Sequence, residues 1–199
     1  MFKHGVFWPK AASYSNPLGV SRAFNAHYTS LGGEFAKGDA KTLKRANGGW
    51  SVTTEDGDAH AEEVVIALGP WSPDVLEPLG IDLPLAVKRG YHWHFAAKGN
   101  ASLTRPVLDA EVGFILGPME QGIRLTTGAE FAHRDAPPTP VQIDRLMPYA
   151  KNLFPLGDPV EPKPWLGARP CFWDSRPVIG RAPGQKGLWL DYGHGHSGL

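Results

Sequence analysis

The stretch Trp165-Leu166-Gly167-Ala168-Arg169-Pro170 places one arginine directly before a proline, and the rest of the chain is organised around it. A glycine-rich stretch follows at the end, Asp191-Tyr192-Gly193-His194-Gly195-His196-Ser197-Gly198-Leu199. Between the two, Gly187-Leu188-Trp189-Leu190 predicts a short apolar strand. We expect the arginine turn and the glycine turn to lie side by side, with the remaining residues supporting them.

The composition limits the classes of protein that this chain can belong to. Its 199 residues include 20 basic and 20 acidic side chains, so no net field attracts nucleic acid or an anionic membrane. A hydrophobic content of 42% is enough for the core of one domain or of two small ones. Cys171 is alone, which excludes an internal disulfide and fits a reducing compartment. No apolar run approaches the roughly 18 residues of a membrane span and Met1–Gly5 has no signal-peptide core, so we expect a cytoplasmic location.

The first part of the chain predicts one helix, a hairpin and a buried strand. Asn16-Pro17 is a helix-start signal and Gly32-Gly33 a stop, which predicts an amphipathic helix over 17–31. Strands around 41–45 and 50–54 are joined by a turn at 47–49. The run 64–68 is continuously apolar, which favours a strand covered on both faces, as in a parallel sheet. The turn after it, Gly69-Pro70-Trp71-Ser72-Pro73, lies where open α/β sheets bind ligands, although its glycine can also serve only to turn the chain.

The pattern changes after Pro84, where we place a domain boundary. Short alternating runs at 87–95, 113–116 and 123–127 predict antiparallel strands of a second sheet. A further helix opens at Thr139-Pro140 and ends at Pro155, and its apolar stripe is expected to pack in a core.

Arg169 and the terminal glycine run are the candidates for ligand chemistry. A guanidinium held in a Gly-x-Arg-Pro turn offers a planar pair of donors suited to a carboxylate. The alternative is a structural arginine that pairs with Asp174 or caps carbonyl groups. The backbone N–H groups of Gly193–Gly198 can converge on an electron-rich oxygen or ring nitrogen.

Two His-x-His pairs, His92/His94 and His194/His196, raise the possibility of a metal site. On a strand, the side chains of His92 and His94 point to one face, but no carboxylate of clear ligand spacing accompanies them, so we expect no metal. A nucleophile is also not expected, because Ser197 lacks a Gly-x-Ser-x-Gly elbow and Cys171 sits among bulky aromatic residues.

Five motifs in order resemble the FAD-dependent amino-acid oxidoreductases related to D-amino acid oxidase, glycine oxidase and D-amino acid dehydrogenase. The motifs are Val64-Val65-Ile66-Ala67-Leu68-Gly69-Pro70-Trp71-Ser72, Val87-Lys88-Arg89-Gly90-Tyr91, Thr127-Gly128-Ala129-Glu130-Phe131, Trp165–Pro170 followed by Asp174–Gly180, and Gly193–Leu199. The resemblance implies an α+β fold, with a partial FAD-binding α/β domain (17–84 and 165–199) and an antiparallel-sheet substrate-binding domain (1–16 and 85–164). The dehydrogenase-like branch is the nearest fit.

The resemblance also implies roles for individual residues. Arg169 is expected to bind the substrate carboxylate, with His196 and Tyr91 as further substrate-facing side chains. The expected FAD contacts are Ala40, Leu68, Gly69, Trp71, Gly167, Gly193, His194, Gly195, His196, Ser197, Gly198 and Leu199. No side chain is assigned a nucleophilic or acid–base role, because the implied reaction is hydride transfer from the substrate Cα to flavin N5.

The implied partners are a small D-amino acid or related amine and an electron acceptor, either oxygen or a quinone. One family feature is absent: residues 1–33 contain no Gly-x-Gly-x-x-Gly fingerprint for the FAD pyrophosphate. We therefore expect these 199 residues alone to bind FAD poorly and to be inactive, and to need a further N-terminal segment. The alternative is a non-catalytic scaffold or assembly chain whose partner supplies the dinucleotide fold.

Overall fold

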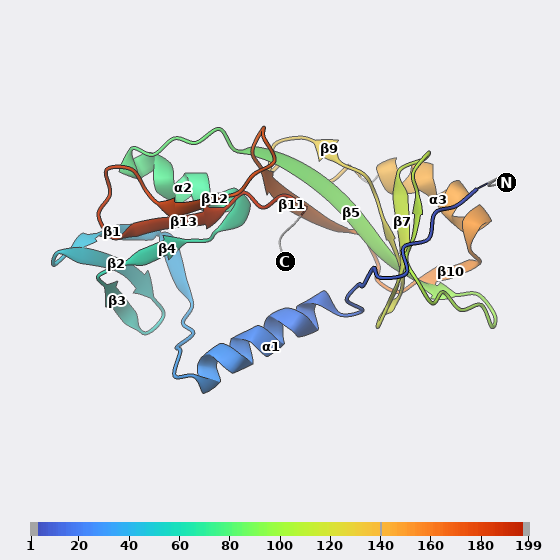
Figure 1. Cartoon of the computed structure of the whole chain (residues 1–199), viewed down its shortest axis with the longest axis horizontal. Coiled ribbons are helices and arrows are strands. Elements are labelled where there is room, and N and C mark those ends of the chain that lie inside the picture. The colour runs from blue at the N-terminus through green and yellow to red at the C-terminus, as the bar shows by residue number, and fades with distance from the viewer. Residues whose placement is uncertain (1–3, 140, 197–199) are drawn as a thin grey trace.

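The structure is a computed structural model that describes residues 4–139 and 141–196. Two small sheets lie at one end of the elongated molecule and a larger sheet at the other, while strands β5 (Ala86–Ala97) and β11 (Trp165–Cys171) run between them (Figure 1). Within the described ranges, every helix is too short or too polar to traverse a bilayer.

Helix α1 (Pro17–Ser30) agrees with the predicted helix over 17–31. The side chain of Asn16 caps it by accepting a hydrogen bond of 2.8 Å from the N–H of Gly19, and Pro17 occupies the first turn. Gly32, with φ of 89°, follows its end. None of its residues is buried, and Phe24 is 65% exposed, so the amphipathic face packs against no core in the described part of the chain.

Strands β1 (Gly38–Ala46), β2 (Gly49–Thr54) and β3 (Gly57–Ala61) form an antiparallel sheet. Asn47 and Gly48 both have positive φ, 51° and 80°, which is the geometry of a two-residue hairpin turn between β1 and β2. The predicted hairpin is thus confirmed.

Strand β4 (Val64–Ile66) pairs in parallel with β13 (Leu188–Tyr192), and β12 (Val178–Arg181) pairs antiparallel with β13. The expectation that 64–68 forms a strand covered on both faces is wrong. The strand ends at Ile66, and Val65 is 57% exposed whereas Ile66 is buried, so only one face is covered; among the described residues, no strand pairs with its second edge. The strand is therefore paired in parallel, as in the sheets that the apolar run suggested, but it is not covered on both faces.

A chain of short helical turns follows β4. It consists of a 3₁₀ turn (Gly69–Trp71), helix α2 (Ser72–Leu76) and a second 3₁₀ turn (Glu77–Leu79). Val75 and Leu76 of α2 are buried against Ile66, Leu188 and Leu190, which fixes the turn at Gly69 beside the sheet.

The seven-stranded sheet is antiparallel, as the alternating pattern predicts, and β5 is its longest strand. Its order is β10-β5-β8-β7-β6, and β9 and β11 also pair with β5. The other members are β6 (Val107–Asp109), β7 (Phe114–Met119), β8 (Gly122–Thr126), β9 (Glu130–Phe131) and β10 (Leu156–Pro159).

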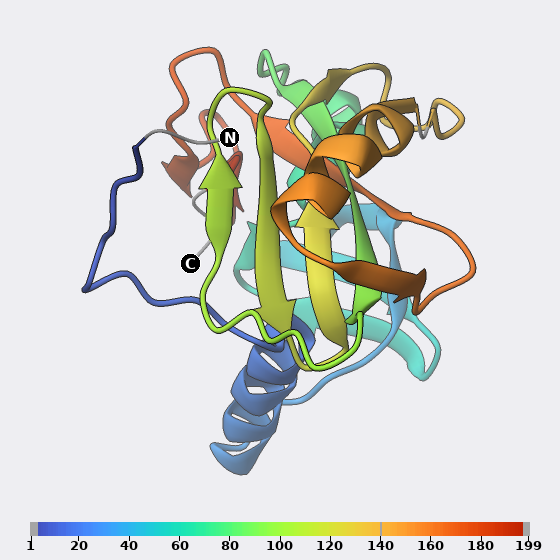
Figure 2. The ribbon, with the colours of Figure 1, turned by 90° about the vertical axis from the view of Figure 1, so that its right-hand side faces the viewer.

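Helix α3 (Val141–Leu153) covers one face of this sheet (Figure 2). Ile143, Leu146 and Ala150 are buried against Tyr91 and Phe95 of β5, which confirms the expected packing of the apolar stripe. Because α3 occupies this face, side chains of β5 that point the other way form a separate surface.

The buried apolar side chains form two clusters. One joins β2, β4, α2 and β13, and the other joins β5, β7, β8 and α3. Strand β11 connects them, since Leu166 packs on the second cluster while Phe172, directly after the strand, belongs to the first. The expected boundaries, 17–84 with 165–199 and 1–16 with 85–164, remain a proposal for the domain division.

Candidate functional site

Arg169 lies on the face of the large sheet that α3 leaves uncovered. In the pairing of β11 with β5, Arg169 is opposite Lys88 and Gly167 is opposite Gly90. Paired residues share a face and residues two apart along a strand share it too, so Lys88, Gly90 and His92 lie on the same side as Arg169. We refer to this surface as the arginine face.

Two glycines allow long side chains to fold flat onto the arginine face. A Cβ on Gly90 would stand 2.1 Å from Nη1 of Arg169, so the guanidinium lies directly over Gly90. A Cβ on Gly167 would stand 2.3 Å from the indole of Trp165. The sheet thus presents a guanidinium and an indole ring next to each other.

The guanidinium of Arg169 is incompletely satisfied. Its Nη1 atom is buried and has no hydrogen-bond acceptor among the described residues. Asp174, the partner in the structural alternative, accepts instead from the N–H of Arg176 at 3.1 Å. A buried donor without an acceptor is costly, and an anionic ligand would satisfy it.

The glycine turn near the end of the chain lies directly beside Arg169. The N–H of Gly195 donates to the carbonyl of Pro170 at 2.8 Å, and His194 forms an isolated antiparallel bridge with Cys171. Gly193 and Gly195 have φ of 90° and 60°, which favours glycine at both positions. The expected neighbourhood of the arginine and the glycine turn is confirmed, but the amide of Gly195 is already engaged by the protein.

His196 lies near Arg169 and Lys88, two cations of the arginine face. Partial burial, followed by the positive charges of Arg169 and Lys88, lowers the pKa of His196. His194 lies apart from this group, with its Nε2 at 3.2 Å from Oδ1 of Asp191. The predicted contacts Ser197, Gly198 and Leu199 lie outside the described residues.

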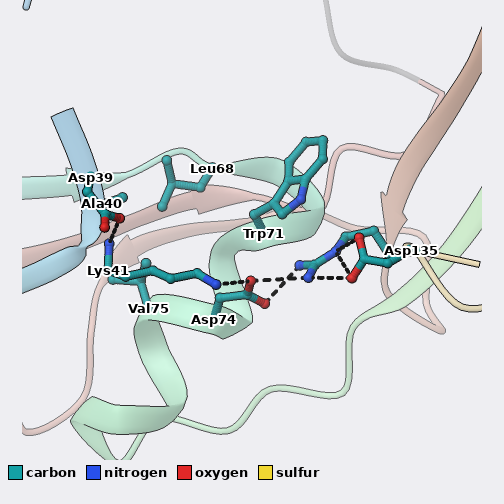
Figure 3. A pocket seen from close by; sticks show the side chains of 9 residues that line it. Asp39, Ala40, Lys41, Leu68, Trp71, Asp74, Val75 and Asp135 are labelled. Atoms are coloured by element: carbon teal, nitrogen blue, oxygen red, sulfur yellow. Dashed lines mark hydrogen bonds and ion pairs between the residues drawn. The ribbon is translucent and has the colours of Figure 1, made fainter. Parts of the chain in front are cut away.

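Ala40, Leu68 and Trp71 line one pocket of about 420 Å³, although they come from β1 and from the turn after β4 (Figure 3). Asp74 lies at its edge and is held by Lys41 at 3.4 Å and by Arg134. Arg134 donates hydrogen bonds to both carboxylate oxygens of Asp74, at 2.8 and 3.1 Å, and to the carbonyl of Pro70 at 3.1 Å. This arginine follows β9, so it ties the large sheet to the turn that carries Gly69 and Trp71.

The residues present fit parts of FAD. Gly69 has φ of 57°, and a Cβ added to it would lie 3.9 Å from Pro170, while Gly195 bonds to the carbonyl of Pro170. Both turns therefore place glycines, which have no side chain, beside β11. This leaves backbone free to approach a flat ring. The pocket offers the apolar side chains of Ala40, Leu68 and Trp71 to a second planar group, together with charged side chains that include Lys41, Asp74 and Arg134. Gly167 carries the Trp165 indole rather than an open surface.

The predicted role of Tyr91 is wrong. Tyr91 is 1% exposed and belongs to the core beneath α3, because its position on β5 is odd whereas Gly90 and His92 are even. Its hydroxyl accepts from the N–H of Thr139 at 2.7 Å and donates to Glu130 at 3.0 Å. The side chain therefore stabilises the face of the sheet that α3 covers.

The arginine face also carries a polar group that we did not predict from the sequence. His94 contacts Oε1 of Glu161 through Nδ1 at 2.5 Å, and its Nε2 accepts from Nε of Arg124 at 3.0 Å. His92 stacks on Trp165 with ring centroids 4.7 Å apart. His92 and His94 do share a face, but within the described ranges no three potential ligands are grouped to hold a metal ion.

The sequence interpretation did not identify four residues of the site: Gly90, Arg124, Arg134 and Glu161. Alternation along 87–95 could have placed Gly90 and His92 on one face, opposite Tyr91. Arg124, Arg134 and Glu161 depend on strand register and on loops that return to the sheet, for which the sequence offers no local signal.

Comparisons with known proteins define the class to which this fold and site belong. The model of the DAO family, described as FAD dependent oxidoreductase, matches residues 1–199. The chain is 34% identical over 149 residues to a D-amino acid dehydrogenase of Paramagnetospirillum magneticum, which covers 74% of this chain and 35% of that protein. It is 31% identical over 206 residues to a glycine oxidase of Pseudomonas putida, which covers 100% of this chain and 54% of that protein.

Solved structures show the same fold. A glycine oxidase from Geobacillus kaustophilus superposes with a TM-score of 0.66 at 23% identity, covering 80% of this chain and 43% of that one. An L-proline dehydrogenase from P. horikoshii superposes with a TM-score of 0.72 at 18% identity, covering 92% and 51%.

The chain belongs to the DAO family of FAD-dependent oxidoreductases. FAD is the cofactor of this family. The chain spans between about a third and about a half of the length of the curated relatives described here.

Proposed function

We propose that the full-length protein oxidises a small D-amino acid or a related amine to the imino acid, which water hydrolyses to the keto acid. The observation that carries this proposal is the buried Nη1 of Arg169, which has no acceptor among the described residues and lies beside the glycine turn. A carboxylate on this guanidinium would hold the α-carbon of the substrate in one place.

The residues of this chain would bind and orient, and none is assigned a nucleophilic role. When bound, FAD supplies the hydride acceptor, flavin N5. Arg169 would bind the substrate carboxylate. His196, whose pKa is lowered by partial burial and then by the charges of Arg169 and Lys88, would stay uncharged beside it. The turns at Gly69 and Gly193 would approach the cofactor with their backbone, and the pocket of Ala40, Leu68 and Trp71 would hold another part of it.

The test is the Arg169→Leu variant of the full-length holoenzyme. We expect the apparent affinity for a carboxylate substrate to fall by roughly 30- to 1000-fold, as when one partner of a hydrogen-bonded ion pair is removed. Arg145→Leu is the matched control, because Arg145 is exposed on α3, on the other side of the sheet. Unchanged affinity in Arg169→Leu would remove Arg169 from this role.

The electron acceptor separates the oxidase and dehydrogenase branches. Oxygen consumption during turnover would identify an oxidase, and reduction of a quinone analogue without oxygen uptake would identify a dehydrogenase. The expected cytoplasmic location stays a prediction, which cell fractionation would test.

A second candidate is a scaffold or assembly chain that needs a partner to supply the dinucleotide fold. The open second edge of β4 and the unburied helix α1 favour it, since both offer surface that the described residues do not cover. A colourless preparation of these 199 residues that gains stability when a partner chain is added would support the scaffold. A yellow preparation with a flavin absorbance band would exclude our expectation that these residues alone bind FAD poorly.

A further inference from the structure

The arginine face carries a second guanidinium at some distance from Arg169. Arg124 on β8 is paired in register with His94 of β5, so its side chain points to the same face as His92 and His94. Strand β8 lies on one side of β5 and β11 on the other, so Arg124 and Arg169 reach over β5 from opposite sides.

The neighbours of Arg124 hold it in a fixed orientation. Because a carboxylate can only accept, the contact of Glu161 with Nδ1 of His94 places the imidazole proton on Nδ1. Nε2 of His94 is then the acceptor for Nε of Arg124, at 3.0 Å. Among the described residues, no hydrogen bond or ion pair engages Nη1 or Nη2 of Arg124, so the two-pronged end of the guanidinium is available to a ligand.

The surface between the two guanidinium groups is aromatic and uncharged. His92 stacks on the Trp165 indole and lies edge-on to His94, with ring centroids 5.2 Å apart. Burial, followed by the charges of Arg124 and His94 and, more weakly, that of Arg169, lowers the pKa of His92 to about 4, while the carboxylate of Glu161 acts in the opposite direction. Both arginines therefore act on His92, which places it between them as a neutral spacer.

The spacing of the two cations fits a short ligand with two anionic ends. The guanidinium of Arg169 lies over Gly90, and Arg124 contacts His94, four residues further along β5, which corresponds to about 13 Å. Each charge-assisted hydrogen bond spans about 3 Å, which leaves on the order of 7 Å between the bound oxygens. A dicarboxylic amino acid reaches this far, whereas alanine or glycine does not.

We propose that Arg124 is a specificity-determining residue and that the substrate carries a second carboxylate, as in an acidic amino acid. This inference rests on the proposed function, because Arg169 holds the carboxylate next to the reacting carbon. Arg124 holds the carboxylate of the side chain, and His94 and Glu161 position Arg124.

The first experiment compares D-glutamate with D-glutamine as substrates of the full-length holoenzyme, because the two differ by one charged group. We expect kcat/KM for D-glutamate to exceed that for D-glutamine by roughly 10- to 100-fold, the range of a hydrogen bond to a charged group. In Arg124→Met this ratio falls to about 1, through a higher KM for D-glutamate. Arg124→Lys keeps the charge without the planar fork and gives an intermediate ratio.

Calorimetry supplies a readout that needs no turnover. Glutarate carries two carboxylates and butyrate one, so glutarate should bind the wild-type holoenzyme roughly 10- to 100-fold more tightly, and Arg124→Met should remove the difference. Arg145→Met, on the other side of the sheet, is the control and should retain it.

Several outcomes would overturn the inference. Equal turnover of D-glutamate and D-glutamine by the wild type would do so even if Arg124→Met fails to fold. Equal losses for both substrates in Arg124→Met would show that Arg124 only braces His94. Loss of the preference in Lys88→Met but not in Arg124→Met would assign the second carboxylate to Lys88. If no amino acid reduces the flavin, the proposed function fails, while the calorimetric comparison still decides whether two anions are bound.

Discussion

Two arginines on opposite faces of one sheet show how differently a guanidinium can be used. Arg89 of β5 is fully buried beneath the α3 side, and each of its three nitrogens donates hydrogen bonds. Its partners are Glu130 at 2.8 Å, the Tyr91 hydroxyl at 3.1 Å, and the carbonyls of His133, Ala136 and Pro137. Arg169, adjacent on β11, points to the other face and has a buried Nη1 without an acceptor among the described residues.

The difference separates a structural arginine from a binding one. A buried cation with every donor satisfied has no capacity left for a ligand, and it fixes the loops that supply its acceptors. A buried donor without an acceptor is unfavourable in isolation, and a carboxylate would remove this cost. Residue type alone predicts the same chemistry for both, so hydrogen-bond satisfaction is what distinguishes them.

The largest effect is expected from Arg89→Met. Removing this guanidinium would leave Glu130, whose side chain is 15% exposed, and three carbonyls without their donor. We expect the free energy of unfolding to fall by about 3 to 5 kcal/mol, measured by urea denaturation of the full-length protein. In Arg169→Met it should change by less than about 1 kcal/mol, since no acceptor among residues 4–139 and 141–196 loses a bond. Equal destabilisation by the two substitutions would break the comparison.

A smaller effect is expected from Gly90→Ala, which tests whether the position of Arg169 matters. The new Cβ would stand 2.1 Å from Nη1, and only the end of a flexible side chain has to move. We expect the stability to be nearly unchanged but the affinity for a carboxylate substrate to fall roughly 10- to 100-fold, because the guanidinium is displaced. Substrate titration of the full-length holoenzyme measures this.

Gly128→Ala is the control for this substitution. A Cβ on Gly128 would meet the carbonyl oxygen of Gly113 at 3.7 Å, which is an ordinary contact. If Gly90→Ala binds the substrate as tightly as Gly128→Ala does, the guanidinium over Gly90 is not the carboxylate-binding group.

Local signals in the sequence predicted much of the fold. The cap at Asn16, the turn at Asn47-Gly48 and the apolar stripe of α3 each depend on neighbouring residues, and the structure confirms all three. The exposure of Val65 was not predictable in this way, because whether a parallel strand is covered depends on elements distant in the sequence.

The candidate site was predictable where one motif carries the geometry. The neighbourhood of Arg169 and Gly195 follows from two short motifs that pair directly with each other. The predicted role of Tyr91 failed because a shift of one residue along a strand exchanges the two faces of the sheet. Arg124 and Glu161 reach the site through register and through the return of a loop, which local sequence patterns do not encode.

A still smaller effect is expected from Asp74→Asn, which tests the link between the large sheet and the Gly69 turn. The hydrogen bonds from Arg134 outweigh the effect of burial and hold the pKa of Asp74 below its ordinary value. The carboxylate therefore stabilises the fold above its unfolded pKa, about 3.9, and this contribution is lost as the pH falls through the lower folded pKa. At pH 7 we expect a loss of about 1 kcal/mol in the free energy of unfolding.

The pH dependence supplies the control for Asp74→Asn. The difference from the wild type should shrink as the pH falls below about 4, since the wild-type carboxyl then becomes protonated. Asp56→Asn, in the exposed turn before β3, should change little at any pH. A difference that persists at low pH would mean that Asp74 acts through packing rather than through its charge.

The smallest effect is a change in the titration of His92, which reports on the arginine face without any ligand. Burial, then the charge of Arg124, lowers the pKa of His92 to about 4, so the folded protein keeps this ring neutral. Unfolded His92 takes up a proton below about 6.5, and the free energy of unfolding should therefore fall as the pH drops from about 6.5 to about 4. Removing Arg124 in Arg124→Met should raise the pKa of His92, measured by NMR titration of its ring signals.

The contrast between the two faces makes this titration specific. Arg145→Met removes an exposed cation on the α3 side of the sheet. The sheet separates this cation from His92, so the pKa of His92 should be the same as in the wild type. Arg169→Met should raise the pKa less than Arg124→Met does, because Arg124 is the larger of the two influences. If His92 titrates near 6.5 in the wild type, the ring is not held between two cations, and the arginine face lacks the neutral spacer on which a second carboxylate site depends.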